Sequence, residues 1–193
     1  MVPFTVHTAI AAPREEIFDF VADMAHREAW WDHCGREFRL EHPVATGVGA
    51  ALRYRLGAGG SKSYLETQIV EAERPRRIVE ATRTGRLGRT RGEVVYELSR
   101  QGRHLTRVEM TVYSEPATVP ERLRERLGGR RWMKRQGKLA LQRLRAVFEE
   151  RPDEPLARTS VAGWEPQKAA RFGAELAGQR DIHTGSGERA SSG

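Results

Sequence analysis

The sequence predicts an α+β domain, in which a curved antiparallel sheet of seven strands packs against one long C-terminal helix. Two short helices are expected after the first strand. Short segments that alternate between apolar and polar residues are separated by short turns, which favours antiparallel neighbours. A segment with apolar residues at helical spacing follows the last of them. It is the only predicted element long enough to cover the apolar face of such a sheet.

The N-terminal part predicts one strand followed by two helices. Residues 4–10 alternate as a strand does, and Pro13 favours the first turn of a helix over residues 14–22. That helix has one apolar face, formed by Ile17, Phe18, Val21 and Ala22. Asp23 is a typical N-cap for the second short helix. The residues of this second helix that we expect to face inward are Ala25, Ala29 and Trp30.

Six further segments, all after residue 36, predict strands with one apolar face. Their approximate ranges are 37–40, 51–56, 65–69, 78–84, 94–98 and 108–112. In three of them the side chains expected to face the core are Leu65, Thr67, Ile69, Val94, Tyr96, Leu98, Val108, Met110 and Val112. Because the turns between them are short, consecutive strands are expected to be antiparallel.

A long helix is predicted from residue 120 to about residue 150, with a break or kink at Gly128 and Gly129. Its inner face is expected to carry Met133, Gly137, Leu141, Leu144 and Phe148. The chain therefore divides into a domain over residues 1–150 and an extended, largely disordered tail over residues 151–193. We expect Trp164 and Phe172 of this tail not to dock on the domain.

Several residues resemble the START-like (SRPBCC) helix-grip superfamily, in particular its polyketide cyclase/dehydrase and lipid-transport branch. They lie in the segments Ile10–Pro13, Ile17–Asp23, Trp30, Glu73–Ile78 and Leu141–Glu149. The resemblance covers about residues 4–150 and implies a helix-grip fold. It also implies a cavity between sheet and C-terminal helix for a hydrophobic or amphipathic small molecule, lipid-like or polyketide-like.

Three functions remain open at this point. The first is binding or carriage of such a molecule. The second is a cofactor-independent cyclase or dehydratase acting on a polyketide-like substrate, and the third is a regulatory interaction protein that uses the basic C-terminal helix. We favour the first, although a filled core without a cavity is the alternative to all ligand-binding interpretations.

Ligand-contacting residues are expected on the inner strand positions, near the second short helix and on the long helix. They are Trp31, Tyr54, Tyr64, Thr67, Thr82, Tyr96, Met110, Trp132, Met133 and Gly137. Tyr96 and Met110 are the strongest of these, because one is large with a polar tip and the other is adaptable. For Tyr54 and Tyr64, an exposed position on the sheet is at least as well supported.

Glu80 is a weak catalytic candidate. If Ile78 points inward, then Glu80 and Thr82 do too, and a carboxyl group in an apolar cavity could act as proton donor or base. We expect the opposite arrangement, with Val79 and Ala81 inward and Glu80 in solvent. The catalytic residues are therefore unknown from sequence.

Other chemistry lacks support in the sequence. His33 and Cys34 are adjacent, but a nucleophile and base need spatial contact that adjacency does not provide. One cysteine and six histidines supply no recognisable metal-ligand spacing, so no metal and no cofactor are expected. The segment 57–63 resembles a phosphate loop, but Ser61 replaces its glycine and it joins two strands, so we interpret it as a hairpin.

The net charge of +7 is concentrated in residues 117–148, which hold 10 basic and 2 acidic residues. The chain has 29 arginines and 4 lysines, so we interpret these charges mainly as a solvated helix face. Weak contact with an anionic membrane surface through Arg130, Arg131 and Arg135 is the sharper hypothesis. Nucleic-acid binding is not expected, because the charges spread around the helix. With one cysteine and no long apolar segment, a cytoplasmic location is expected.

Overall fold

The computed structural model describes residues 3–57, 64–84, 90–150, 156 and 158–160. The strands are β1 (Phe4–Ile10), β2 (Gly35–Leu40), β3 (Ala51–Leu56), β4 (Tyr64–Glu73), β5 (Arg77–Thr84), β6 (Thr90–Arg100) and β7 (Thr106–Glu115). The helices are α1 (Arg14–Ala22), η1 (Met24–His26), α2 (Arg27–Trp31), α3 (Val119–Arg124), η3 (Glu125–Gly129) and α4 (Arg130–Glu149). The predicted fold class, a seven-stranded antiparallel sheet with two short helices and a long C-terminal helix, is confirmed.

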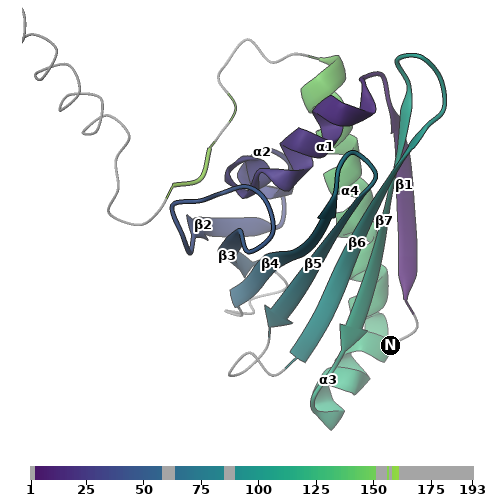
Figure 1. Ribbon diagram of the computed structural model, residues 1–193. Coiled ribbons are helices and arrows are strands. Elements are labelled where there is room, and N and C mark those ends of the chain that lie inside the picture. The colour runs from purple at the N-terminus through teal and green to yellow at the C-terminus, as the bar shows by residue number, and fades with distance from the viewer. Residues whose placement is uncertain (1–2, 58–63, 85–89, 151–155, 157, 161–193) are drawn as a thin grey trace, which may run out of the picture. The chain divides into compact units, whose positions relative to one another are not determined.

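The seven strands form one antiparallel sheet in the order β1-β7-β6-β5-β4-β3-β2 (Figure 1). The first and last strands are therefore neighbours, and Phe4 faces Val112 across them. Register irregularities between Ile69 and Glu71 in β4, and between Arg36 and Arg39 in β2, bend the sheet. The resulting curved face is the one that the helices cover.

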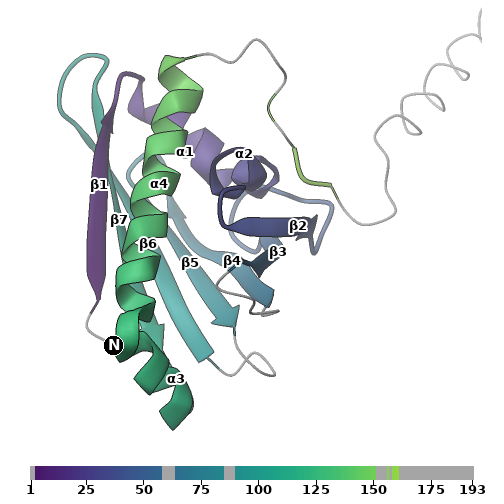
Figure 2. The ribbon, with the colours of Figure 1, turned by 180° about the vertical axis from the view of Figure 1, so that it is seen from behind.

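Helix α4 crosses this face along β1 (Figure 2). Gly137 explains the close approach, because a Cβ atom there would lie 2.6 Å from Cε of Met110 and 3.4 Å from Cγ2 of Val6. The end of α4 is held by Glu149, whose Oε1 accepts a hydrogen bond from the backbone N–H of Ala11 at 3.0 Å. The helix thus seals the β1–β7 side of the core.

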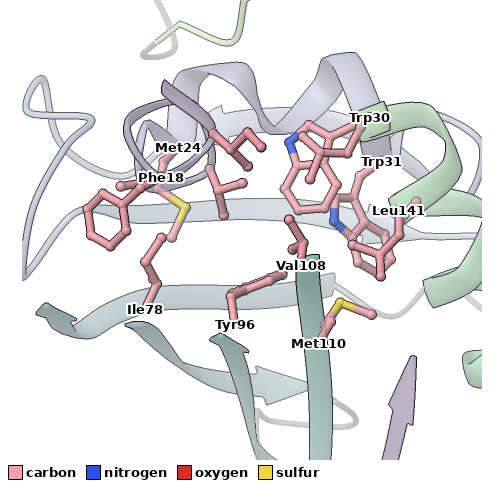
Figure 3. Packing of buried hydrophobic residues seen from close by; sticks show 14 of the residues in the cluster. Phe18, Met24, Trp30, Trp31, Ile78, Tyr96, Val108, Met110 and Leu141 are labelled. Carbon is pink, nitrogen blue, oxygen red and sulfur yellow. The ribbon is translucent and has the colours of Figure 1, made fainter. Parts of the chain in front are cut away.

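Helices α1, η1 and α2 cover the remaining part of the curved face, where η1 is capped as expected. Oδ1 of Asp23 accepts a hydrogen bond from the N–H of Ala25 at 2.9 Å. Figure 3 shows Trp30 and Trp31 of α2 facing Tyr96 of β6, with Leu141 of α4 beside Trp31. The core therefore lies between these helices, α4 and the sheet.

The predicted C-terminal helix is interrupted where the sequence indicated. Gly128 has a φ angle of 132°, which disfavours other residues, and it lies within η3, two residues before α4 begins. On α4, the expected positions Gly137, Leu141 and Leu144 are buried, as is Ala140. The other two expected inner positions, Met133 and Phe148, are half-buried.

A short segment beyond α4 contacts the domain. The N–H of Thr159 donates to the carbonyl of Ala25 at 2.8 Å, and the N–H of Leu40 donates to the carbonyl of Ser160 at 3.3 Å. Arg158 pairs with Asp23 at 3.0 Å. The interpretation of Trp164 and Phe172 lies outside the described residues.

Among the helices of the described ranges, none is both long enough and apolar enough to cross a bilayer.

Candidate functional site

A charged pair lies inside the core, formed by Arg27 of α2 and Glu80 of β5. The two residues are 2% and 1% exposed. Met24 precedes Arg27 by three residues and Trp30 follows by three, so the arginine shares the buried side of its short helical segment. On β5, Glu80 follows the buried Ile78 by two positions, which places both side chains on the inner face of the strand.

Both members of the pair have further hydrogen-bond partners. Nη2 of Arg27 donates to Oε1 of Glu80, and its Nη1 donates to the hydroxyl oxygen of Tyr96 at 3.0 Å. The hydroxyl of Thr67 donates to Oε2 of Glu80 at 3.0 Å. The sulfur of Met24 lies 3.6 Å from Nη2. Strands β4, β5 and β6 and helix α2 thus each contribute to one polar cluster, which we call the Arg27–Glu80 cluster.

Aromatic rings surround the guanidinium group of Arg27. Its Cζ atom lies 4.7 Å from the ring centroid of Trp30 and 5.8 Å from that of Tyr96. Burial acts to lower the pKa of Arg27, but the charge and hydrogen bond of Glu80 outweigh it and leave the pKa above its ordinary value. The arginine therefore carries its positive charge at neutral pH.

The two buried tyrosines in this region stay neutral. Burial raises the pKa of Tyr96 and of Tyr54 well above the usual value, although the charge of Arg27 opposes the rise. Tyr54 of β3 is stacked on Phe38 with ring centroids 5.0 Å apart. Both hydroxyl groups therefore remain protonated and available as hydrogen-bond donors.

Three buried donors at or beside the cluster have no partner among the residues that the structure describes. They are Nε of Arg27, Nε1 of Trp30 and Nε1 of Trp31. Buried N–H groups normally donate a hydrogen bond, and each buried donor without a hydrogen-bond acceptor costs about 1–3 kcal/mol.

The expectation that Glu80 lies in solvent is wrong, because Ile78 and Glu80 are both buried and Ala81 is exposed. The orientation of β5 was predicted wrongly because Val79, on the opposite face of the strand from Glu80, is also buried. On the outer face Val79 lies opposite Val95, which is buried too, so β5 carries apolar residues on both faces. Parity alone could not distinguish the faces of such a strand.

The other predicted ligand-contacting residues lie in three places. Thr67 and Tyr96 belong to the Arg27–Glu80 cluster, and Tyr54 is close to it. Those packed in the core under α2 and α4, or half-buried at its edge, are Trp31, Thr82, Met110, Trp132, Met133 and Gly137. Tyr64 lies on the outer face, where its hydroxyl donates to Glu37 at 2.9 Å and Arg53 stacks on its ring.

His33 and Cys34 do not form a nucleophile–base pair. Cys34 is buried, and burial raises the pKa of its thiol to about 12, so the reactive thiolate is disfavoured. Nε2 of His33 lies 3.2 Å from the carbonyl oxygen of Gln136 on α4. The histidine thus connects the end of α2 to α4 and is not directed at the cysteine.

Arg27 was not predicted from the sequence as a site residue. A signal for it was present, because Arg27 lies three residues from both Met24 and Trp30 and four from Trp31, all of them apolar. A basic residue on the apolar side of a short helix, together with one acidic residue on an apolar strand, predicts a buried pair.

Comparisons with known proteins agree with this architecture. A START superfamily protein from Mycobacterium smegmatis superposes with a TM-score of 0.58 at 14% identity, covering 78% of this chain and 99% of that one. A protein from Thermus thermophilus gives 0.60 at 16% identity, with coverage of 78% and 99%. Ginseng major latex-like protein 151 from Panax ginseng gives 0.51 at 11% identity, with 76% and 97%. At these identities the likeness concerns the fold alone.

The search of curated proteins found no match. The family model described as "Polyketide cyclase / dehydrase and lipid transport" matches residues 1–149, which include every strand and helix of the domain. The chain therefore belongs to the polyketide cyclase/dehydrase and lipid transport family.

Proposed function

We propose that the domain binds an amphipathic small molecule between the curved sheet and α4, with a polar oxygen of that molecule at the Arg27–Glu80 cluster. The family and fold support a ligand-binding domain. The observation that carries the finer proposal is the pair of buried donors, Nε of Arg27 and Nε1 of Trp30, which have no partner among the described residues.

The cost of the charged pair is the first argument. Removing two charges from water carries a penalty of several kcal/mol per ion, and well-packed apolar residues would often serve stability equally well. The surrounding side chains, including Ile69, Ile78 and Met110, are fully buried apolar residues. A charged pair among them is more easily explained by recognition of a ligand than by stability.

The chemistry of the cluster limits the ligand. Arg27 and Glu80 together carry no net charge, so a second carboxylate would meet the negative charge of Glu80 without compensation. The unpartnered groups beside it, on Arg27, Trp30 and Trp31, are all N–H donors, which require an acceptor. We infer that the polar group is an uncharged oxygen, such as a carbonyl, attached to an apolar chain or ring that lies among the core side chains.

Native mass spectrometry of the purified full chain tests this proposal. A bound small molecule is expected in the wild-type protein, or after incubation with a long-chain methyl ketone, and not in the double variant Arg27→Met/Glu80→Leu. The matched control is Arg77→Met/Glu97→Leu, which removes an ion pair from the outer face (N to O, 3.2 Å). Equal retention of the ketone by both double variants would refute the role of the cluster.

A cyclase or dehydratase activity is the second candidate, and the buried position of Glu80 favours it. Its carboxylate accepts from Thr67 and Arg27, and neutral tyrosine hydroxyls lie nearby, so a proton acceptor and donors converge. Glu80→Gln preserves the shape of the side chain. Incubation with a poly-β-ketone thioester should give a cyclised or dehydrated product with wild-type protein and none with this variant. Absence of any product with the wild type would leave binding as the function.

A further inference from the structure

The segment formed by α3 and η3 carries exposed apolar side chains. Val119, Leu123 and Leu127 are 73%, 54% and 79% exposed. They recur at every fourth position, so they form one stripe along this segment. In Figures 1 and 2, α3 lies at one end of the domain, beyond the end of β7. No side chain described in this segment belongs to the buried core.

Basic side chains flank the apolar stripe. Arg122 and Arg126 are exposed and follow Val119 by three and seven residues, so they form the adjacent row on the same side of the helix. The basic surface continues into the first half of α4 with exposed Arg131, Lys134, Arg135 and Lys138. This segment therefore combines aliphatic side chains with positive charge at one end of the domain.

We propose that the stripe Val119, Leu123 and Leu127, with Arg122 and Arg126, docks the domain on an anionic lipid bilayer. A helix that inserts aliphatic side chains among acyl chains while its basic residues contact anionic headgroups lies in the plane of the interface. Binding is weak and reversible, because the segment is short. The proposal goes beyond ligand binding and does not depend on it, since the core cluster and this surface share no residue.

The chemistry of the surface favours a bilayer over nucleic acid. A single-stranded nucleic acid would need exposed aromatic rings for stacking, whereas the exposed apolar residues here are aliphatic. The aromatic residue closest in sequence, Trp132, is half-buried and packs against the core. Aliphatic side chains gain free energy by leaving water for acyl chains, but gain nothing comparable from a phosphate backbone.

Flotation of the full chain with vesicles tests the proposal. The probe is phosphatidylcholine vesicles with and without phosphatidylglycerol. Wild-type protein should float with the anionic vesicles, less at high salt, and not with neutral ones. Each leucine is expected to contribute about tenfold to binding and each arginine about fivefold. Leu123→Asp/Leu127→Asp should therefore lose about a hundredfold, and Arg122→Glu/Arg126→Glu at least about 25-fold.

Two controls alter equivalent exposed residues elsewhere. Val44→Asp replaces an apolar side chain that is 65% exposed, and Arg103→Glu reverses a charge in the turn between β6 and β7, at the opposite end of the sheet. Both should bind within about twofold of wild type. Because α3 lies outside the core, the test variants should keep the circular dichroism and melting temperature of the wild type.

Three results would overturn the proposal. The first is absence of wild-type binding to anionic vesicles. The second is binding that the leucine substitutions leave unchanged. The third is equal or tighter binding of single-stranded DNA that depends on the arginines and not on the leucines, which would assign the surface to nucleic acid.

Discussion

Replacing Glu80 by Ala should destabilise the domain strongly, because it leaves the guanidinium group of Arg27 buried without its counter-charge. The arginine would keep only the hydroxyl of Tyr96 and the sulfur of Met24, and its Nε has no partner among the described residues to compensate. Breaking a buried pair from one side costs about 3–5 kcal/mol. Domains of this size are stable by only about 5–15 kcal/mol, so the loss is a large fraction of the total.

The double variant Arg27→Met/Glu80→Leu should behave differently. It removes both charges and supplies apolar side chains of similar length, so we expect an unfolding free energy within about 1 kcal/mol of wild type, or above it. If each single substitution costs about 3–5 kcal/mol, the coupling between the two positions is therefore about 5 kcal/mol or more.

Urea unfolding of the wild type, Arg27→Met, Glu80→Leu and Arg27→Met/Glu80→Leu measures this cycle. The difference between the urea midpoints of two proteins, multiplied by a common m-value, gives the change in unfolding free energy. If Glu80→Leu is too unstable to purify, Glu80→Gln and Arg27→Met/Glu80→Gln replace the two variants that contain it. A cost below about 1 kcal/mol for either single variant, or additivity of the two, would show that the pair is not a buried, mutually dependent unit.

Three further predictions concern other buried or half-buried positions. Cys34, with its pKa raised to about 12, should react with a disulfide reagent at pH 8 only at the rate of unfolding, and a burst of labelling in the native protein would contradict this. Burial lowers the pKa of His33, so the unfolded chain binds the proton more tightly and the unfolding free energy should fall as the pH drops below about 6.5. His33→Gln should reduce that fall in urea titrations, and the exposed control His104→Gln should not. Gly137→Leu, which has no room beside Met110, should lower the unfolding free energy by about 1–3 kcal/mol; no change in the urea midpoint would contradict the close packing of α4.

The sequence predicted the fold well because each element carried its own local signal. The alternation of β1 and of β7, the cap at Asp23 and the break at Gly128 depend on residues close together in the chain. The order of these elements then left one long helix to cover the sheet. Residues close together in the sequence are therefore enough to predict strands, helix caps and helix breaks, because these depend on the local backbone conformation.

The candidate site was harder to predict because it depends on pairing between distant residues. Arg27 and Glu80 are 53 positions apart, and each needs the opposite charge of the other to be buried in the core. Val79, which is buried on the outer face of β5, made the orientation of that strand ambiguous. Resolving it required the register that pairs Glu80 with Val94, which the local pattern does not contain.

The central claim is that a ligand oxygen meets the unpartnered donors of Arg27 and Trp30. The most direct measurement is a ¹H–¹⁵N correlation spectrum of the full chain during titration with a long-chain methyl ketone. Substitution of Trp30 by Phe assigns its indole signal among those of the 4 tryptophans. The account predicts that the Trp30 indole and Arg27 Nε–H signals move together and saturate. Saturable shifts elsewhere in the core, with both of these signals unmoved, would contradict it.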